Sequence, residues 1–584
     1  MAVDTETTTT TIPVTDSDRI DDQNNLTSNA IPHASEKTVP DSPASEQNEV
    51  SDESEDKPSK TKKSFGFYAI IVALALTSLL TSLEATITST ALPTITSELG
   101  GASLYVWVVN GYYLTQTAFQ PFVGQMADIY GRRWPMICSA AMFTIGSGVA
   151  GGSKNIQTLI AGRLLQGIGS GGILVLTEII ICDLLPLRER GKYLGMIVSL
   201  VGIGAALGPL FGGLIVQYSS WPWVFYLNVP IGGVACLMLF FFLRVRSDKT
   251  PNYMQRLRRF DWIGNVLFVM SMVSILIALS WAGTEYPWSS FRVVVPLVLG
   301  FVGSAAFVVY EGSSFCVNPT MPLHIFSNRT SGTAFAVTFL HTLSSVSVMY
   351  FLPVYFQAVL NASPSRSGVQ LLPTILFMIP GAIAGGTLLS KFGRYRPLQH
   401  GGLAFMIIGF GLLTLLDADS NTGEWVGYQL LGALGTGLAL PVLLPAVQAP
   451  LTEEDTALCT ATWSFMRTYG FIWGATIATA VFNNRFDVLA PRITDTTIGS
   501  QLTNGRAYEL ATKVFMNSIK DPVTQREVKS VYVDALNVVW YVSLAFAGLG
   551  FLLVFLEKEI TLRKELDTKY AMEEKKKKPE NSEA

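Results

Sequence analysis

The chain has 584 residues, of which 49% are apolar and 15% are charged, and its mean hydropathy is +0.37. Soluble domains carry about a quarter charged residues, so this composition excludes an ordinary soluble domain and favours a protein that lies within a membrane. The net charge of −3 is segregated, because residues 1–63 hold 14 acidic and 6 basic side chains. We expect residues 1–64 to form a disordered acidic tail, since so few apolar side chains cannot offset the entropy of the chain.

Fourteen segments after this tail are apolar and long enough to cross a bilayer, which takes about 20 residues of helix. Helices are the expected crossing element because they satisfy their own backbone hydrogen bonds inside the hydrocarbon. The sequence therefore predicts an all-α membrane protein. In chain order the predicted spans are 67–92, 105–127, 135–152, 156–181, 194–217, 224–243, 262–283, 291–310, 332–356, 369–389, 398–416, 425–447, 462–482 and 536–556.

One twelve-residue turn occurs twice. The segment 124–135 (GQMADIYGRRWP) lies between the second and third predicted spans, and a diverged copy, 386–397 (GTLLSKFGRYRP), lies between the tenth and eleventh. Glycine, Gly-Arg and proline recur at a constant offset of 262 residues. A charged turn repeated between apolar spans indicates a duplicated chain whose halves use the turn in the same way.

Basic residues in the short loops predict the orientation, because they are retained on the cytosolic side. One set of alternating loops carries fifteen lysines and arginines, whereas the opposite set, up to the twelfth span, carries only Lys154, Arg292 and Arg366. With an even number of spans, both termini are expected in the cytosol. One loop disagrees, because residues 453–455 (EED) are acidic where the rule expects basic residues.

The long connection on the predicted outer side, 483–533, mixes apolar and charged residues. Its part 507–519 has the mixture that is typical of an amphipathic surface helix. The sequence therefore predicts a surface helix in this connection.

Charged side chains inside spans are candidates for function, because a charge there is costly unless it faces a partner or a polar cavity. Glu84 in the first span and Arg163 in the fourth have opposite sign and comparable depth. They are candidate partners in proton coupling, and a permanent ion pair that braces the bundle is the alternative. Glu178, near the cytosolic end of the fourth span, is either an inner proton acceptor or an interfacial residue. Arg467 lies deep in the thirteenth span with no partner evident in the sequence.

Several blocks resemble the major facilitator superfamily, and within it the fourteen-span drug:proton antiporters that include fungal toxin and multidrug efflux pumps. The turn in 124–133 is similar to the signature between the second and third spans. The segment 159–171 (LIAGRLLQGIGSG) is similar to the fourth-span pattern, and 202–213 (GIGAALGPLFGG) to the fifth-span antiporter pattern. The segment 83–93 (LEATITSTALP) is similar to the first-span pattern, with Glu84 where the family usually has aspartate.

The resemblance implies a major-facilitator-type bundle of 14 transmembrane helices. Two six-helix halves, 65–245 and 331–556, flank two extra central helices in 246–330, and a charged cytosolic tail, 557–584, follows.

The resemblance also implies functional groups of residues. The fourth-span arginine and the first-span acid are assigned to proton coupling. Asp128 and Arg132, four residues apart, are expected to form an ion pair or a helix-end interaction that latches one conformation. Glycines every four residues in the fifth span form a smooth stripe that proline can bend. The expected sets are Glu84 and Arg163 for proton coupling; Gly124, Asp128, Gly131, Arg132 and Arg133 for the gating turn; Gly204, Gly208, Pro209 and Gly212 for the antiporter helix; and Gln116, Gln120, Gln357 and Tyr355 for the lining of an amphipathic substrate cavity.

We therefore expect a proton-coupled efflux transporter for hydrophobic small molecules, such as a fungal secondary metabolite, a mycotoxin or an antifungal drug. The expected partners are the substrate, protons and the lipid bilayer, with no nucleic acid and a monomeric chain, in the plasma membrane or alternatively the vacuolar membrane. A carrier of basic amino acids or other small cations is the alternative cargo class, and a non-transporting membrane sensor is an alternative of another class. The sequence has no Walker-type loop, metal-ligand cluster or nucleophile elbow, so we expect no enzyme, no metal and no cofactor, with the proton gradient as the energy source.

Overall fold

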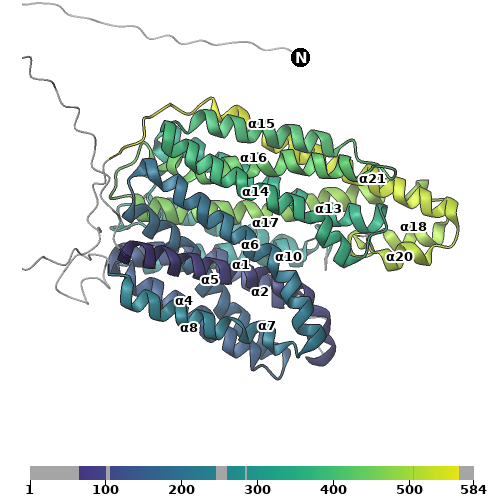
Figure 1. The fold of residues 1–584 in the computed structure, drawn as a ribbon, viewed down its shortest axis with the longest axis horizontal. Helices are drawn as coiled ribbons and strands as arrows, with labels where there is room; N and C mark the ends of the chain where they lie inside the picture. Colours follow the sequence, from purple (N-terminus) through teal and green to yellow (C-terminus); the bar gives the residue numbers. More distant parts are fainter. Residues whose placement is uncertain (1–64, 100–104, 245–258, 283–285, 504, 565–584) are drawn as a thin grey trace, which may run out of the picture. The chain divides into compact units, whose positions relative to one another are not determined.

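The computed structural model describes residues 65–99, 105–244, 259–282, 286–503 and 505–564. The tail predicted in 1–64, and most of the one predicted in 557–584, lie outside these residues. Helices account for most of the described chain (Figure 1), and no strand occurs within it. In order, the helices are α1 (Phe65–Leu99), α2 (Tyr105–Ala118), α3 (Gln120–Tyr130), α4 (Arg133–Gly151), α5 (Ile156–Leu184), α6 (Leu187–Tyr218), α7 (Pro222–Tyr226), α8 (Asn228–Phe242), α10 (Trp262–Trp281), α11 (Phe291–Glu311), α12 (His324–Ser327), α13 (Arg329–Val354), η1 (Tyr355–Val359), α14 (Pro364–Phe392), α15 (Arg396–Leu413), α16 (Thr422–Gln448), α17 (Thr456–Leu489), η2 (Ala490–Arg492), α18 (Thr496–Leu502), α19 (Arg506–Glu509), α20 (Lys513–Ser518) and α21 (Pro522–Val554).

Helices occur over all fourteen predicted spans. Within the described residues, eleven helical segments are apolar and long enough to cross a membrane. The remaining predicted spans correspond to α15, to α17 and to α2 followed by α3. The helix of the second span is interrupted at Phe119, two residues before Pro121, whose ring nitrogen has no hydrogen to donate. The structure therefore has the helices expected of an all-α membrane bundle.

Short polar side chains begin many of these helices. Asn155 accepts a hydrogen bond from the Thr158 amide at 2.8 Å at the start of α5, and Asn421 forms a capping box with Glu424 at the start of α16. Such caps satisfy the amide groups that the first turn of a helix leaves unpaired. The repeated turn ends helices differently, because Gly131 and Gly393 have positive φ angles of 82° and 69°.

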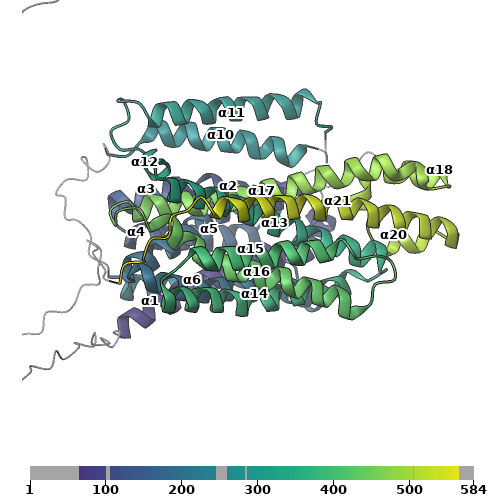
Figure 2. The same cartoon turned by 90° about the horizontal axis from the view of Figure 1, so that it is seen from above.

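Following the domains predicted from the sequence, we divide the long helices into three groups. The N-terminal half is α1–α8, the C-terminal half is α13–α17 with α21, and the inserted pair is α10 and α11, which pack side by side (Figure 2). The inserted pair contacts α2 of the N-terminal half and α17 of the C-terminal half. For example, Phe268 of α10 packs edge-on against Phe465 of α17, with ring centroids 5.0 Å apart.

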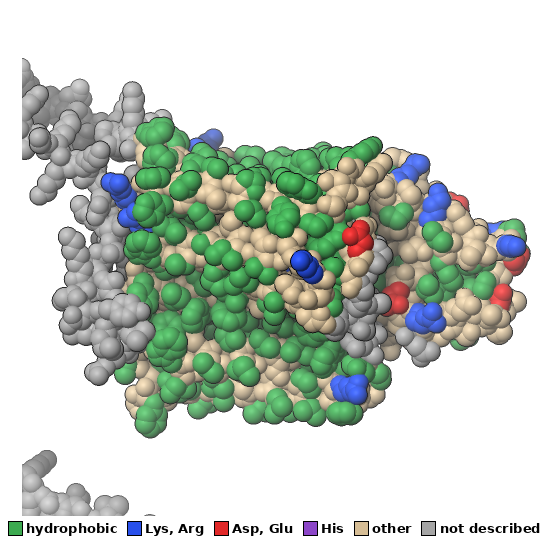
Figure 3. Space-filling view, turned by 90° about the horizontal axis from the view of Figure 1, so that it is seen from below, with side chains coloured by type: hydrophobic (Ala, Val, Ile, Leu, Met, Phe, Trp, Pro, Cys, Tyr) green, Lys and Arg blue, Asp and Glu red, His purple; other side chains and the backbone are tan. Residues whose placement is uncertain are grey.

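Apolar side chains cover much of one face of the molecule (Figure 3). Exposed valines and leucines are also frequent on α11, where Leu299 and Val302 are each 61% exposed. Such a continuous apolar surface is unstable in water and stable in contact with lipid acyl chains. The outer surface of the bundle therefore supports the predicted membrane setting.

We call the end of the bundle that carries Arg132, Arg188, Arg190 and Lys391 the basic end. The two halves are joined there by several side chains: Arg188 Nε donates to the Ser390 carbonyl at 2.8 Å, and Arg190 Nη1 donates to Gln448 Oε1 at 2.8 Å. Farther from the basic end, the rings of Tyr113 and Phe471 stack across the halves with centroids 5.9 Å apart. The structure is therefore a conformation in which the basic end is closed.

The segment after α21 crosses this closed end. Arg396 of α15 donates to the carbonyls of Val554 and Phe555, the Lys558 amide donates to Thr330 Oγ1 at 3.0 Å, and Leu562 is buried. Arg563 then reaches both sides, because its side chain donates to the Leu451 carbonyl at 2.7 Å and its carbonyl accepts from the Arg188 amide at 3.2 Å. We call residues 557–564 the C-terminal strap.

The connection expected as one long loop, 483–533, is mostly helical. α17 continues to Leu489 and α21 begins at Pro522, so the two helices extend well beyond their predicted spans. The prediction of a single surface helix over 507–519 is wrong, because α19 and α20 are separate short helices. Met516 of α20 is fully buried, so this part of the connection does not lie on the surface. Tyr532 of α21 donates to the Ala507 carbonyl at 2.7 Å, which shows that the connection is packed against its own helices.

Candidate functional site

The predicted partners Glu84 and Arg163 are in contact. Glu84 on α1 accepts a hydrogen bond from Arg163 Nη1 on α5, and both side chains are almost fully buried, with exposed fractions of 0% and 1%. Asn228, at the start of α8, donates its amide Nδ2 to the other carboxylate oxygen of Glu84. All three helices belong to the N-terminal half, so the pair is enclosed within one half.

A polar network holds Arg163 from the remaining sides. Its Nε donates to the Val108 carbonyl at 2.9 Å, and Nη1 also donates to Gln166 Oε1 at 3.0 Å. The guanidinium lies 4.4 Å from the ring centroid of Tyr112, in the geometry of a cation–π contact. These contacts compensate for removing two charges from water, which costs several kcal/mol per ion when it is not compensated.

Gln116, expected in the substrate cavity, belongs to this same network. Its Nε2 donates to Ser170 Oγ at 2.8 Å, and Ser170 also accepts the hydroxyl of Tyr112 at 2.7 Å. Gln120, one helical turn onward, instead crosses to the other half, where its Nε2 donates to Thr468 Oγ1 at 3.1 Å. The two glutamines therefore serve different contacts.

The other two residues expected in that cavity lie in a π-helical turn, η1. Tyr355 is 1% exposed and donates its hydroxyl to the Asp417 carbonyl at 2.7 Å, inside the C-terminal half, whereas Gln357 is half-buried. The structure does not bring these residues together with Gln116 and Gln120.

One cavity of about 350 Å³ lies between α1, α6 and α8. It adjoins the Glu84 cluster along the chain, because Leu83 and Leu227 line it. Its lining is entirely apolar, which suits apolar groups and differs from the glutamine- and tyrosine-lined cavity that the sequence suggested. The lining residues are Leu76, Leu79, Leu80, Leu83, Leu207, Phe211, Ile215, Leu227 and Ile231.

The charges of the gating turn bind within the N-terminal half. Arg132 Nε donates to Asp183 of α5 at 2.6 Å, and its Nη1 lies 3.9 Å from Asp128, four residues earlier. Arg133 donates to the Phe240 carbonyl of α8 at 2.7 Å. In this conformation the turn fastens α3, α4, α5 and α8 to one another, and the sequence did not indicate Asp183 as the main partner.

The first glycine of the repeated turn contacts the opposite half in both copies. A Cβ built on Gly124 of α3 would lie 2.2 Å from the Cβ of Ala461 on α17. A Cβ built on Gly386 of α14 would lie 2.2 Å from the Gly191 carbonyl oxygen on α6. Both positions therefore require glycine for the halves to approach this closely, and the repeat predicted from the sequence corresponds to a repeated contact.

The glycine stripe of α6 packs against α1. A Cβ at Gly204 would lie 2.9 Å from the Leu79 carbonyl, and one at Gly208 would lie 1.9 Å from Thr86 Oγ1. Gly212 is buried one turn farther on, and Pro209 lies within the same helix. The stripe thus brings the backbone of α6 close to the helix that carries Glu84.

A second intramembrane ion pair joins the two halves, and the sequence did not predict it. Arg467 Nη2 of α17 lies 2.7 Å from Glu178 Oε1 of α5. The guanidinium of Arg467 also lies 4.8 Å from the ring centroid of Trp463, one turn earlier. The only signal in the sequence was that both residues are charged and lie inside predicted spans.

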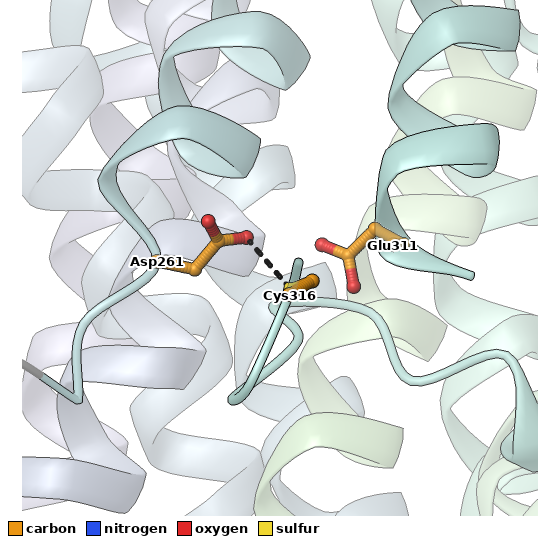
Figure 4. A group of neighbouring side chains, drawn as sticks. All are labelled: Asp261, Glu311 and Cys316. Atoms are coloured by element: carbon orange, nitrogen blue, oxygen red, sulfur yellow. Dashed lines mark hydrogen bonds between the residues drawn. The ribbon is translucent and has the colours of Figure 1, made fainter. Parts of the chain in front are cut away.

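One further cluster, at the base of the inserted pair, groups Asp261, Glu311 and Cys316, whose potential ligand atoms lie within 4.8 Å of one another (Figure 4). The chain already uses these groups. Asp261 caps α10 through the Gly264 amide at 2.9 Å, Glu311 accepts the Thr320 amide at 3.0 Å, and the Cys316 thiol donates to Asp261 at 3.7 Å. Burial, together with the negative charge of Asp261, raises the pKa of Cys316 to about 12, so this thiol stays protonated. The cluster fastens α10 to α11 and the loop that follows.

Comparison with solved structures shows the same architecture. The human organic anion transporter MFSD10 (TETRAN) superposes with a TM-score of 0.54 at 14% identity, over 84% of this chain and 100% of that chain. The proton:xylose symporter XylE superposes with a TM-score of 0.52 at 13% identity, over 80% and 98% of the two chains. At such low identity these similarities concern the fold alone.

Sequence relatives are much closer. The chain is 51% identical over 540 residues to the MFS-type transporter pydD of an Acremonium species, which covers 92% of this chain and 93% of that protein. It is 46% identical over 524 residues to the efflux pump FUS6 of Gibberella moniliformis, which covers 90% and 93% of the two chains. The family model of the major facilitator superfamily matches residues 74–475. This protein is therefore a multi-pass membrane protein of the major facilitator superfamily, a family of transporters for small molecules.

Proposed function

We propose that this chain is a proton-coupled efflux transporter that exports hydrophobic small molecules, such as a fungal secondary metabolite or toxin. The observation that carries the proposal is the buried Glu84–Arg163 pair, because a charged pair is retained inside a membrane bundle chiefly where ions or charged groups are handled. Relatives with 45–46% identity that are named efflux pumps support the direction of transport.

Glu84 is the carboxylate that exchanges a proton, and Arg163 is the cation whose proximity sets the proton affinity of Glu84. The gating-turn residues Gly124, Asp128, Gly131, Arg132 and Arg133, together with the glycine stripe of α6, allow the halves to rock between a conformation closed at one end and a conformation closed at the other. Gln120 is the member of the expected substrate set that we retain, since within the described residues it alone of the four donates a side-chain hydrogen bond to the opposite half.

The basic end faces the cytosol, both chain termini lie there, and the chain acts as a monomer in the plasma membrane. The excess of lysine and arginine in the loops of that end supports this orientation. The apolar exposed face and the apolar cavity between α1, α6 and α8 support a hydrophobic cargo and contact with lipid.

The test uses the purified full-length chain in liposomes that are loaded at pH 8 with rhodamine 6G, a hydrophobic dye. Dilution into buffer at pH 6 is expected to accelerate dye export relative to dilution at pH 8 and relative to protein-free liposomes. Glu84→Gln is expected to abolish the effect of the gradient, whereas Glu84→Asp and the exposed-site control Glu509→Gln are expected to retain it.

A parallel arm uses radiolabelled arginine, because a carrier of basic amino acids would move arginine and not the dye. Gradient-driven export by Glu84→Gln at the wild-type rate would contradict the role of Glu84. Absence of gradient-driven movement of either probe by the wild-type chain would contradict the proposed function.

A further inference from the structure

The two intramembrane ion pairs differ in how they relate to the halves. The partners of Glu84, which are Arg163 and Asn228, lie in its own half, so a rigid rotation of one half against the other leaves that pair intact. Glu178 and Arg467 lie in different halves and are 2.7 Å apart. Opening of the basic end must therefore separate them.

The position of Glu178 makes this separation consequential. Glu178 is six residues from the end of α5 at the basic end, about 9 Å at the rise of an α-helix. Its side chain is 8% exposed, and Oε2 has no hydrogen-bond partner among the described residues. A carboxylate in this position that loses its guanidinium partner must either become hydrated or take up a proton.

The neighbouring groups leave Arg467 as the dominant charge at Glu178. Arg467 comes from α17, and Cys182 is the titratable group one turn away on α5 itself. His341, on α13, interacts electrostatically with the charge of Arg467. Its ring Nε2 lies 3.2 Å from the Thr436 carbonyl oxygen. The contact with α17 also includes Ser464, one turn before Arg467.

We propose that Glu178 is a second proton-exchanging carboxylate, which is paired with Arg467 while the basic end is closed and protonated when that end opens. The inference rests on the proposed function and adds a residue to it. The proton is taken from water at the open end and binds a carboxylate oxygen of Glu178, and it returns to water when Arg467 comes back. On uptake an O–H bond of a hydronium ion breaks as the O–H bond to Glu178 forms, and on release the reverse exchange returns the proton to water.

The sign of the pH dependence follows from the pair. While the basic end is closed, burial favours the neutral acid at Glu178, and the Arg467 cation opposes this effect by favouring the charged carboxylate. Opening removes the cation while Glu178 stays about 9 Å inside the end of its own helix, so under this proposal burial then acts unopposed and the open conformation binds the proton more tightly. By linkage, acid favours opening of the basic end. One such proton changes the ratio of open to closed molecules by at most about tenfold per pH unit.

The experiment measures opening directly and needs no cargo. Spin labels replace two exposed residues at the basic end, Arg244 in the N-terminal half and Phe392 in the C-terminal half, in full-length protein whose native cysteines are alanine. Pulsed electron resonance distances are recorded in nanodiscs from pH 5 to pH 9. We expect the long-distance population to grow as pH falls, and the slope to decrease by about one proton in Glu178→Gln.

Three further variants separate proton exchange from a structural brace. Glu509→Gln makes the same chemical change at an exposed site and is expected to keep the wild-type slope. Arg467→Gln is expected to favour the open population at every pH and to flatten the slope. The exchange Glu178→Arg with Arg467→Glu restores a pair across the halves and is expected to restore the slope, which also provides the test should Glu178→Gln fail to fold.

An unchanged slope in Glu178→Gln would overturn the inference, and so would an exchanged pair that folds without regaining the slope. Neither result depends on rhodamine export, so the inference can fail while the proposed function stands. Conversely, failure of dye transport with a Glu178-dependent slope would contradict the proposed function alone.

Discussion

Arg190 at the start of α6 donates a 2.6 Å hydrogen bond to Glu453 in the loop between α16 and α17. Glu453 also lies 3.7 Å from Arg563 of the C-terminal strap, so one acid links both halves and the strap. Asp455, two residues on, pairs with His324 at 2.8 Å. This explains why the loop 453–455 departs from the expectation of basic residues at this end: its acids are partners for arginines and a histidine that the same end supplies.

Loss of Arg190 should destabilise the closed basic end strongly. The Arg190 side chain is 1% exposed, and its removal leaves Glu453 without its closest cation. Breaking a buried pair by removing one partner typically costs about 3–5 kcal/mol. Arg190→Ala should therefore lower the melting temperature, measured by tryptophan fluorescence of the full-length chain in detergent.

The matched control for Arg190→Ala is Arg492→Ala, which removes a similarly short pair, with Asp534 at 2.7 Å, on an exposed surface. Exposed ion pairs contribute only about 0–1 kcal/mol. If the melting temperature fell equally in the two variants, the buried Arg190–Glu453 pair would contribute no more to stability than an exposed ion pair.

The C-terminal strap should make stability depend on pH through Glu557. Burial raises the pKa of Glu557 from its usual 4.5 to about 8, although the nearby Arg396 cation opposes the rise. Neither carboxylate oxygen has a hydrogen-bond partner among the described residues. The folded protein therefore keeps this proton where the unfolded chain would lose it, and the resulting stabilisation, complete below pH 4.5, is lost as pH rises through about 8.

Glu557→Gln cannot lose a proton, so its melting temperature should fall less than that of the wild type between pH 6 and pH 9. The exposed neighbour Glu559 provides the control, because Glu559→Gln removes a carboxylate from the same segment without removing a buried one. Parallel curves for wild type and Glu557→Gln would exclude a buried titration at the strap.

The two copies of the repeated turn should respond differently to the same substitution. Gly131 has φ 82° and ψ 170°, a region essentially restricted to glycine, whereas Gly393 has φ 69° and ψ 16°, the left-handed region that asparagine tolerates. Gly131→Asn should cost about 1–3 kcal/mol, and Gly393→Asn much less. Melting temperatures of the two variants measure the difference, and equal losses would contradict it.

The spans and the duplication were predictable from the sequence, because hydropathy and a constant offset are properties of neighbouring or regularly spaced residues. The pairing of Glu84 with Arg163 was also predictable, since only opposite charges at similar depth had to be matched. Asn228, Asp183 and Arg467 were not found as partners, because their contacts join helices far apart in the chain and depend on how those helices rotate about their axes. Helix extensions beyond the bilayer, as in α17 and α21, also escape a criterion based on apolar length.

The contacts of Gly124 and Gly386 predict that added volume at either position will hold the basic end open. A Cβ at Gly124 meets the Cβ of Ala461, so Gly124→Ala should increase the long-distance population of the Arg244–Phe392 label pair, and adding Ala461→Gly should reverse the increase because it removes the obstructing methyl group. A Cβ at Gly386 meets the backbone oxygen of Gly191, and no substitution at Gly191 can remove a backbone atom. We therefore expect that no second substitution at Gly191 will reverse the opening caused by Gly386→Ala.

Gly233→Ala is the control for these two substitutions, because among the described residues no atom would lie within 4 Å of a Cβ at Gly233. It changes the helix propensity in the same way without touching the opposite half. If Gly233→Ala opened the basic end as much as Gly386→Ala, the close approach of the halves would not be what keeps that end shut. If only the two turn glycines do so, the repeated turn acts in each half as the point where that half touches the other.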